Sequence, residues 1–444
     1  MPVHPLPEDP SLENLRKRAK SLLRAVRAGE PRAVAAFREL HPRAETALAR
    51  SALADAQLVL ARSFGFASWA RLRRHLGVVE SHLWDPPPPL DPVALAAAHP
   101  ADAFLRLACL AYGSWHPTWP ARAERLLAGR PDLAGASLHA AAAAGDVDAA
   151  RAWLDREPVL LEKKGGALGW EPLLYACYSR LAPGSGRSTL DVARLLLSRG
   201  ADPDAGFLWR GNVPPFTALT GAFGEGEEGH NQPPHPERDA LARALLEAGA
   251  DPNDEQTLYN RHFGPDDGHL VLLFEYGLGR ERTGRWRRLL GDRLHGPRQA
   301  LVEELWAAAR RGFADRVELL LDHGVDPNAC GWRDGRTPYE AALASGHREI
   351  AAQLASRGAR HVEQTPEEAF AAACVAGDGE AVRALLAGDP ELGERPGPDG
   401  RAALVARAVE ARRPAGVRLM AALGFELSRP GRRCTRPPGS GTWS

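Results

Sequence analysis

The chain has 444 residues, of which 44% are hydrophobic and 25% are charged. It can bury a large core, but it exceeds the usual size of one compact domain, so we expect two domains or one elongated array. Lys and Arg together number 56, and so do Asp and Glu, which leaves no basic excess to hold a polyanion and argues against a nucleic-acid partner.

The cysteines are scattered and show no Cys-x-x-Cys spacing: Cys109, Cys177, Cys330, Cys374 and Cys434. This pattern predicts reduced, mostly packing residues rather than a disulfide framework or a zinc site. The N-terminal segment contains no apolar run, and no stretch approaches the roughly 18 uninterrupted apolar residues of a membrane-spanning helix. We therefore expect a cytoplasmic protein that makes no membrane contact.

A small helical bundle is predicted over residues 1–84. Asp9 and Pro10 favour a helix start, and apolar residues then recur at three- and four-residue steps, which predicts a first helix ending at Gly29. Its basic face is interpreted as solvated, because acidic residues dilute it at its start. Shorter helices follow, and their boundaries are marked by Gly65, Ser68 and Gly77. A proline run over residues 85–92 favours a stiff spacer, and we place the domain boundary there.

Residues 93–431 predict a series of short helix pairs. Leu-rich helices run into Gly-Ala-Asp-Pro turns at residues 200–203 and 249–252. These turns are 49 residues apart (249 − 200), because Gly- and Pro-rich insertions at residues 183–186 and 224–236 enlarge the turns inside the pairs. The array is therefore expected to be irregular.

Residues 311–360 show the repeating unit most clearly. A Leu-rich helix runs into His-Gly-Val-Asp-Pro-Asn, a loop carries Asp-Gly-Arg-Thr-Pro, and two short apolar patterns precede a second glycine turn. Gly324 and Gly358 lie 34 residues apart (358 − 324), close to the roughly 33-residue period of an ankyrin repeat. Residues 136–141, Ala-Ser-Leu-His-Ala-Ala, match the start of that repeat, Thr-Pro-Leu-His-x-Ala, with Ser for Thr and Ala for Pro.

The chain therefore resembles the ankyrin-repeat family, and residues 54–69 resemble an N-terminal helical region of bacterial ankyrin-repeat proteins. The resemblance implies an all-α solenoid of about eight helix pairs with β-turn loops, preceded by the bundle. It also implies a structural role for His139, whose ring would hydrogen-bond the backbone rather than hold a metal or act in catalysis.

The tail, residues 432–444, has neither a repeat pattern nor core residues. One codon choice for residues 432–438, read from one base earlier in the Gly431 codon, translates as Thr-Pro-Leu-His-Glu-Ala-Ala-Trp, which is the start of a further repeat. We interpret the tail as a frameshifted repeat that leaves the last helix pair without a polar cap. A nucleotide sequence whose alternative frame encodes no further repeats would contradict this interpretation.

The sequence contains no phosphate loop, dinucleotide fingerprint, nucleophile elbow or His-Glu-x-x-His motif. We therefore expect no catalysis, cofactor or metal. One alternative is a small-ligand, metal-binding or enzymatic site around residues 259–269, where histidines and carboxylates crowd together: His262, Asp266, Asp267 and His269. An Asp-Asp-Gly turn, however, uses such side chains for its own backbone hydrogen bonds.

Repeated helix pairs generate a long surface without a catalytic pocket, which favours a non-catalytic protein that binds another protein through its concave face and loops. Aromatic and Arg residues are typical contact anchors on such a surface. The candidate contacts are Phe207, Trp209, Arg210, Tyr259, Arg261, His262, Asp267, Trp332 and Arg333. We expect a monomer, with association possible through the uncapped last repeat, and the fold does not name the partner.

Overall fold

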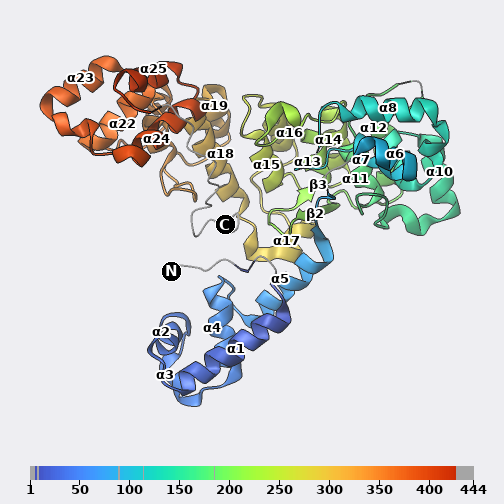
Figure 1. The fold of residues 1–444 in the computed structure, drawn as a ribbon, viewed down its shortest axis with the longest axis horizontal. Helices are drawn as coiled ribbons and strands as arrows, with labels where there is room; N and C mark the ends of the chain where they lie inside the picture. Colours follow the sequence, from blue (N-terminus) through green and yellow to red (C-terminus); the bar gives the residue numbers. More distant parts are fainter. Residues whose placement is uncertain (1–5, 8–9, 89–90, 114, 185, 427–444) are drawn as a thin grey trace.

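Helices make up most of the chain. The computed structural model describes residues 6–7, 10–88, 91–113, 115–184 and 186–426. The predicted cap Asp9 and the tail interpreted as a frameshifted repeat, residues 432–444, lie outside the described residues. Figure 1 shows a blue N-terminal bundle beside a long row of helix pairs that runs from cyan to red.

Five helices form the N-terminal bundle: α1 (Leu12–Arg27), α2 (Pro31–Leu40), α3 (Ala44–Arg50), α4 (Leu53–Ser63) and α5 (Trp69–His82). The Ser11 side chain caps α1, and Ser68 caps α5 as the sequence predicts. The predicted end of α5 at Gly77 is wrong, because the buried residues Leu76 and Val78 on either side hold the helix together. Such packing outweighs the cost of about 1 kcal/mol for glycine inside a helix.

After α6 (Pro92–Ala98), nine helix pairs can be followed through the described residues: α7 (Pro100–Ala108) and α8 (Trp119–Gly129); α9 (Leu138–Ala144) and α10 (Val147–Arg156); α11 (Pro172–Tyr178) and α12 (Thr189–Ser198); α13 (Ala218–Phe223) and α14 (Arg238–Glu247); α15 (Glu255–Arg261) and α16 (Gly268–Glu275); α18 (Pro297–Arg311) and α19 (Ala314–Asp322); α20 (Pro338–Ala344) and α21 (Arg348–Ser356); α22 (Pro366–Ala376) and α23 (Gly379–Gly388); α24 (Gly397–Glu410) and α25 (Pro414–Ala422). The extra helix α17 (Arg285–Leu290) separates the fifth pair from the sixth. Short 3-10 helices stand at five places: η1 (Pro131–Gly135), η2 (Pro158–Glu162), η3 (Gly229–Asn231), η4 (Gly291–Arg293) and η5 (Pro390–Gly393). The array is thus an all-α repeat solenoid.

Local signals explain most helix starts and turns in the array. Thr337 and Thr365 each form a capping box with a glutamate three residues later, which satisfies backbone N–H groups of the first turn. Gly145 ends α9 with a φ of +74°, and a Cβ there would lie 2.7 Å from the backbone of Ser188. Only glycine combines that conformation with so close an approach.

A small sheet joins the bundle to the array. Its order is β1 (Leu83–Trp84), β2 (Gly206–Trp209) and β3 (Phe216–Thr217), with β1 parallel and β3 antiparallel to β2. Leu83 pairs with Leu208, and Trp84 pairs with Trp209. The spacer at residues 85–92 therefore separates two parts that share this sheet.

The two largest hydrophobic cores among the described residues of the array follow one another along it. One is continuous from Trp84 to Leu354 and contains the stacked rings of Trp170 and Phe207, whose centroids are 5.1 Å apart. A separate core around Phe370 holds the last two helix pairs. Every residue of the alanine-rich helix α9 is buried, since small side chains allow neighbouring helices to approach closely.

His139 has the structural role that the resemblance implies, because its Nε2 lies 2.9 Å from the backbone carbonyl oxygen of Lys163.

Three cysteines are buried as predicted, but Cys330 is exposed, and Cys434 lies outside the described residues. No helix in the described part of the chain combines the length and apolarity needed to cross a membrane.

Candidate partner-binding site

The nine predicted contact residues do not share one surface. Phe207 is 3% exposed and stacks on Trp170, so its ring belongs to the core; this corrects the prediction that it contacts a partner. Trp209 is half-buried, and its Nε1 donates a hydrogen bond to the carbonyl oxygen of Tyr112 at 3.2 Å. The Arg210 guanidinium lies 4.7 Å from the centre of the Trp209 ring. Trp209 and Arg210 therefore form a cation–π pair that is separate from the other predicted contact residues.

Arg261 and Asp267 lie in a polar seam, which we define as the ion-paired side chains between the α15–α16 turn and α19. Arg261 is fully buried and pairs with Glu225 and with Asp266, at 2.7 Å from the latter. Arg316 of α19 is also fully buried and pairs with Asp267. Full burial of Arg261 corrects the prediction that it contacts a partner, whereas the Asp267 side chain is 19% exposed and its contact with a partner stays a prediction.

The ion pairs of Asp266 and Asp267 with arginines argue against the alternative metal site at residues 259–269. Asp266 and Asp267 face arginines, and His269 is fully buried. Burial and the nearby charge of Arg316 hold the pKa of His269 well below its usual value of 6.5. No group of three or more His, Cys, Asp or Glu side chains suited to a metal ion occurs among the described residues. The histidines and carboxylates of residues 262–269 are thus not gathered around one point.

Four of the predicted residues do come together in a narrow cleft between α15 and α18, which we call the α15–α18 cleft: Tyr259, His262, Trp332 and Arg333. The cleft leaves about 30 Å³ of free space. Its remaining lining residues come from the loop after β2, from α15, from the segment before α18 and from α18 itself: Pro214, Leu258, Glu255, His295, Ala300, Glu303 and Glu304.

Aromatic stacking and one ion pair fix the loop that closes this cleft. The Trp332 ring stacks on the His295 ring with centroids 3.8 Å apart and planes 4° from parallel. The Arg333 guanidinium lies 5.4 Å from the centre of the Tyr259 ring, and its Nε donates a hydrogen bond to Glu303 Oε1 at 2.5 Å. The loop after α19 therefore folds back onto α15 and α18.

Two adjacent carboxyl groups lie at the base of the cleft. Glu303 is 3% exposed and Glu304 is 2% exposed. Glu303 Oε2 and Glu304 Oε2 have no hydrogen-bond partner among the described residues, and Glu304 Oε1 is 3.8 Å from His262 Nδ1. Burial raises the pKa of each carboxyl from its ordinary 4.5 to about 7. Burial, together with the charges of nearby arginines, holds the pKa of His262 well below its usual value.

The two glutamates and His295 are missing from the sequence-based set. A signal for the glutamates exists, because Glu303 and Glu304 interrupt a helix whose neighbours Val302, Leu305 and Trp306 are all buried. An acidic pair inside an apolar helix is costly to bury unless it is paired or used. His295 gave no comparable signal, since only the fold brings it against Trp332.

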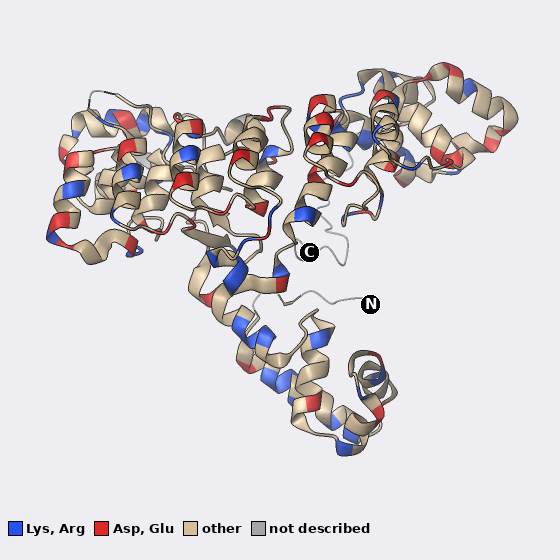
Figure 2. Ribbon diagram, turned by 180° about the vertical axis from the view of Figure 1, so that it is seen from behind, with Lys and Arg blue, Asp and Glu red and all other residues tan. Residues whose placement is uncertain are grey.

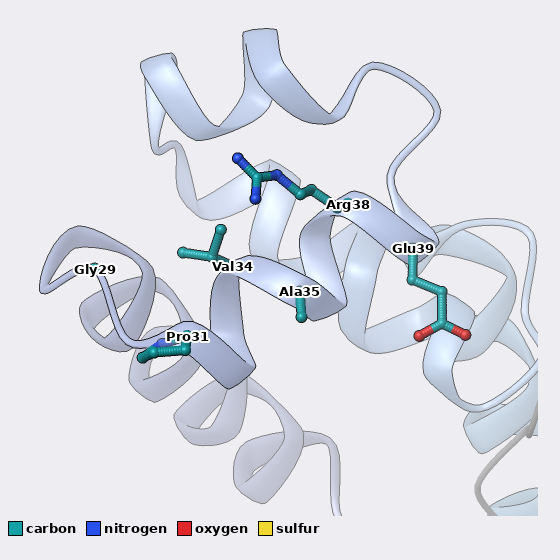
Figure 3. Close-up of a pocket in the computed structure, with 6 residues that line it drawn as sticks. All are labelled: Gly29, Pro31, Val34, Ala35, Arg38 and Glu39. Carbon is teal, nitrogen blue, oxygen red and sulfur yellow. The ribbon is translucent and has the colours of Figure 1, made fainter.

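Two other surfaces, a recess on α2 and the basic residues of α1 and α5, are weaker candidates for a partner-binding site. A recess of about 540 Å³ on α2 is larger, and Figure 3 shows its lining residues along that helix and at its start: Gly29, Pro31, Val34, Ala35, Arg38 and Glu39. None of them is buried. Figure 2 shows basic residues along α1 and α5, where exposed side chains such as Lys17 pair with neighbouring carboxylates. The α2 recess has no buried residue in its lining, whereas on α5 the buried His75 has an Nδ1 without a hydrogen-bond partner among the described residues.

Comparison with known proteins agrees with the helix-pair architecture. The family model described as Ankyrin repeat matches residues 168–206 and 305–332. The first span covers α11 and α12, and the second covers part of α18, all of α19 and the loop as far as Trp332. No curated protein matches the chain. The chain therefore carries ankyrin repeats within an all-α helical solenoid.

Proposed function

We propose that this chain binds another protein through the α15–α18 cleft and the loop that closes it, and that it carries out no chemistry of its own. Ankyrin repeats are generally protein-interaction modules, and repeat solenoids present extended binding surfaces. The observation that carries the proposal is that Tyr259, Trp332 and Arg333 lie together at one cleft. Tyr, Trp and Arg are the residues that contribute most to binding energy at protein interfaces.

The size of the cleft supports a binding surface over an enzyme site. Small-molecule and cofactor sites occupy about 300–1,000 Å³, whereas this cleft leaves about 30 Å³. The 3.8 Å separation of His262 Nδ1 and Glu304 Oε1 is longer than a hydrogen bond, so these side chains do not form a coupled acid–base pair. The proposal extends to a monomeric, cytoplasmic protein of bacterial origin with an N-terminal helical region.

Site-specific crosslinking in the source cell tests this function. A photo-reactive phenylalanine analogue would replace Trp332 in one variant and Trp153 in a control, because Trp153 is half-buried on α10, far along the array from the cleft. We expect the analogue at residue 332 to capture one protein in stoichiometric amounts and the analogue at residue 153 not to capture it. Equal capture at both positions, or capture at neither, would contradict the proposal.

A further inference from the structure

The base of the α15–α18 cleft gathers carboxyl groups that the neighbouring hydrogen-bond donors satisfy only in part. Its lining includes three carboxyl groups, those of Glu255, Glu303 and Glu304, but only one arginine, Arg333. Arg333 is already engaged through Glu303 Oε1. Oε2 of Glu303 and Oε2 of Glu304 have no hydrogen-bond partner among the described residues, whereas Glu255 is paired with His295 at 3.0 Å and with Arg287 at 3.9 Å. Removing such groups from water is costly, and a cation among them would recover that cost.

The neighbouring charges do not supply this cation. Arg316 faces Glu304 from α19, but its guanidinium pairs with Asp267 and donates hydrogen bonds to backbone carbonyls. The Arg311 guanidinium of α18 lies 4.6 Å from the centre of the Phe263 ring. His262, directly after α15, faces Glu304, and burial together with the surrounding arginines holds its pKa well below the usual value. These arginines lower the pKa of Glu304 through their charge, while their ion pair and ring contact lie with other groups.

Aromatic rings flank the same carboxyl groups. Tyr259 and Trp332 both line the cleft, and the Tyr259 ring already accepts a guanidinium at 5.4 Å from its centre. Rings in this arrangement attract a cation through their π faces. Carboxylates combined with aromatic walls select an organic cation, such as an ammonium or guanidinium group, rather than an anion or an apolar side chain.

We propose that the α15–α18 cleft receives one Lys or Arg side chain of the partner protein, whose cationic head group pairs with Glu303 and Glu304 between the rings of Tyr259 and Trp332. This inference rests on the proposed protein-binding function and names the chemistry of the contact. About 30 Å³ of free space is one water molecule's share of volume, so a head group fits only where the Arg333 side chain makes room for it. The Arg333 side chain is 33% exposed, so it can swing outward to admit that head group.

Peptide selection on the full chain provides the test. Random peptides displayed on phage would be selected against the wild-type chain, and each enriched peptide would be made again with its Lys replaced by norleucine and its Arg by citrulline. We expect the neutral peptide to bind wild type at least about tenfold more weakly, since truncating one partner of a buried charge pair has effects of this size or larger. Fluorescence anisotropy measures both affinities.

Two substitutions locate the effect. Glu304→Gln keeps the shape of the side chain and removes its charge, and Glu318→Gln makes the same change at an exposed position on α19. We expect Glu304→Gln to weaken the original peptide about tenfold and to leave the neutral peptide unchanged. Glu318→Gln should change neither affinity. Equal affinities of the charged and neutral peptides, or of wild type and Glu304→Gln, would overturn the inference.

Failure of the inference is distinguishable from failure of the proposed function. Peptides that bind wild type and lose binding in Trp332→Ala, but do not respond to loss of their own positive charge, overturn the cation contact and leave protein binding at the cleft intact. Selection that yields no peptide dependent on Trp332, together with no crosslink from that position, overturns both.

Discussion

Replacing Glu304 by Gln is expected to stabilise the folded chain at pH 8 and to have little effect near pH 4. The Glu304 side chain is 2% exposed, and burial raises its folded-state pKa from 4.5 to about 7. Below pH 4.5 the group is protonated in both states, so its ionisation contributes nothing. Between pH 4.5 and 7 the unfolded chain ionises while the folded chain keeps its proton, and stability therefore falls as the pH rises.

The size of the effect follows from the separation of the two pKa values. Each pKa unit corresponds to ~1.4 kcal/mol. The rise in the Glu304 pKa from 4.5 to about 7 therefore lowers the free energy of unfolding of the wild-type chain by about 3 kcal/mol above pH 7. The Gln variant lacks this cost. Its advantage in free energy of unfolding should therefore grow from near zero at pH 4 to about 3 kcal/mol at pH 8.

Urea unfolding at several pH values between 4 and 8, followed by tryptophan fluorescence, measures this difference. Glu318→Gln is the control, because it removes the same charge from an exposed position and should shift stability by less than about 0.5 kcal/mol at every pH. A Glu304→Gln variant less stable than wild type at pH 8 would refute the reasoning. That result would mean that ionised Glu304 is stabilised by Arg316 and Arg333 by more than burial costs it.

Three further changes test other parts of the structure by urea unfolding. Arg316→Met should lower the free energy of unfolding by about 3 kcal/mol or more, because it leaves Asp267 without its partner; a neutral result would show that the polar seam contributes no stability. Gly145→Ala should cost more than Gly200→Ala, since both have positive φ but only the first meets backbone within 4 Å; equal losses would contradict the packing argument. Phe207→Ala should cost about 3–5 kcal/mol and leave the peptide affinity of the folded fraction unchanged in anisotropy, whereas a loss of affinity would restore Phe207 as a contact.

The helix pairs could be predicted from the sequence because their signals are local. Ser68 and Thr337 cap helices with their own side chains, and Gly324 and Gly358 adopt positive φ at turns where the pattern places glycine. Features set by contacts between distant residues were not predicted. Continuation of α5 past Gly77 depends on partners more than a hundred residues away in sequence, such as Leu208 beside Val78.

The candidate site was predicted in part for the same reason. Tyr259, Trp332 and Arg333 are predictable as contacts because aromatic and Arg residues are typical anchors on the face and loops of a repeat array, and the structure places them at one cleft. Phe207 belongs to the same residue class, but strand pairing turns its ring into the core. The importance of Glu304 depends on how completely α18 is buried, which the alternation of residue types along one helix does not specify.

The pairing of β1 with β2 has a consequence for the order in which the chain is made. Leu83 leaves the ribosome 125 residues before its strand partner Leu208 (208 − 83). At about 5–20 residues per second, this delay lasts roughly 6–25 s. During that time the edge of β1 lacks its strand partner, and the Trp84 ring lacks Phe207, which packs against it in the finished fold. The bundle can therefore collapse early, but its attachment to the array must wait for synthesis of the middle of the chain.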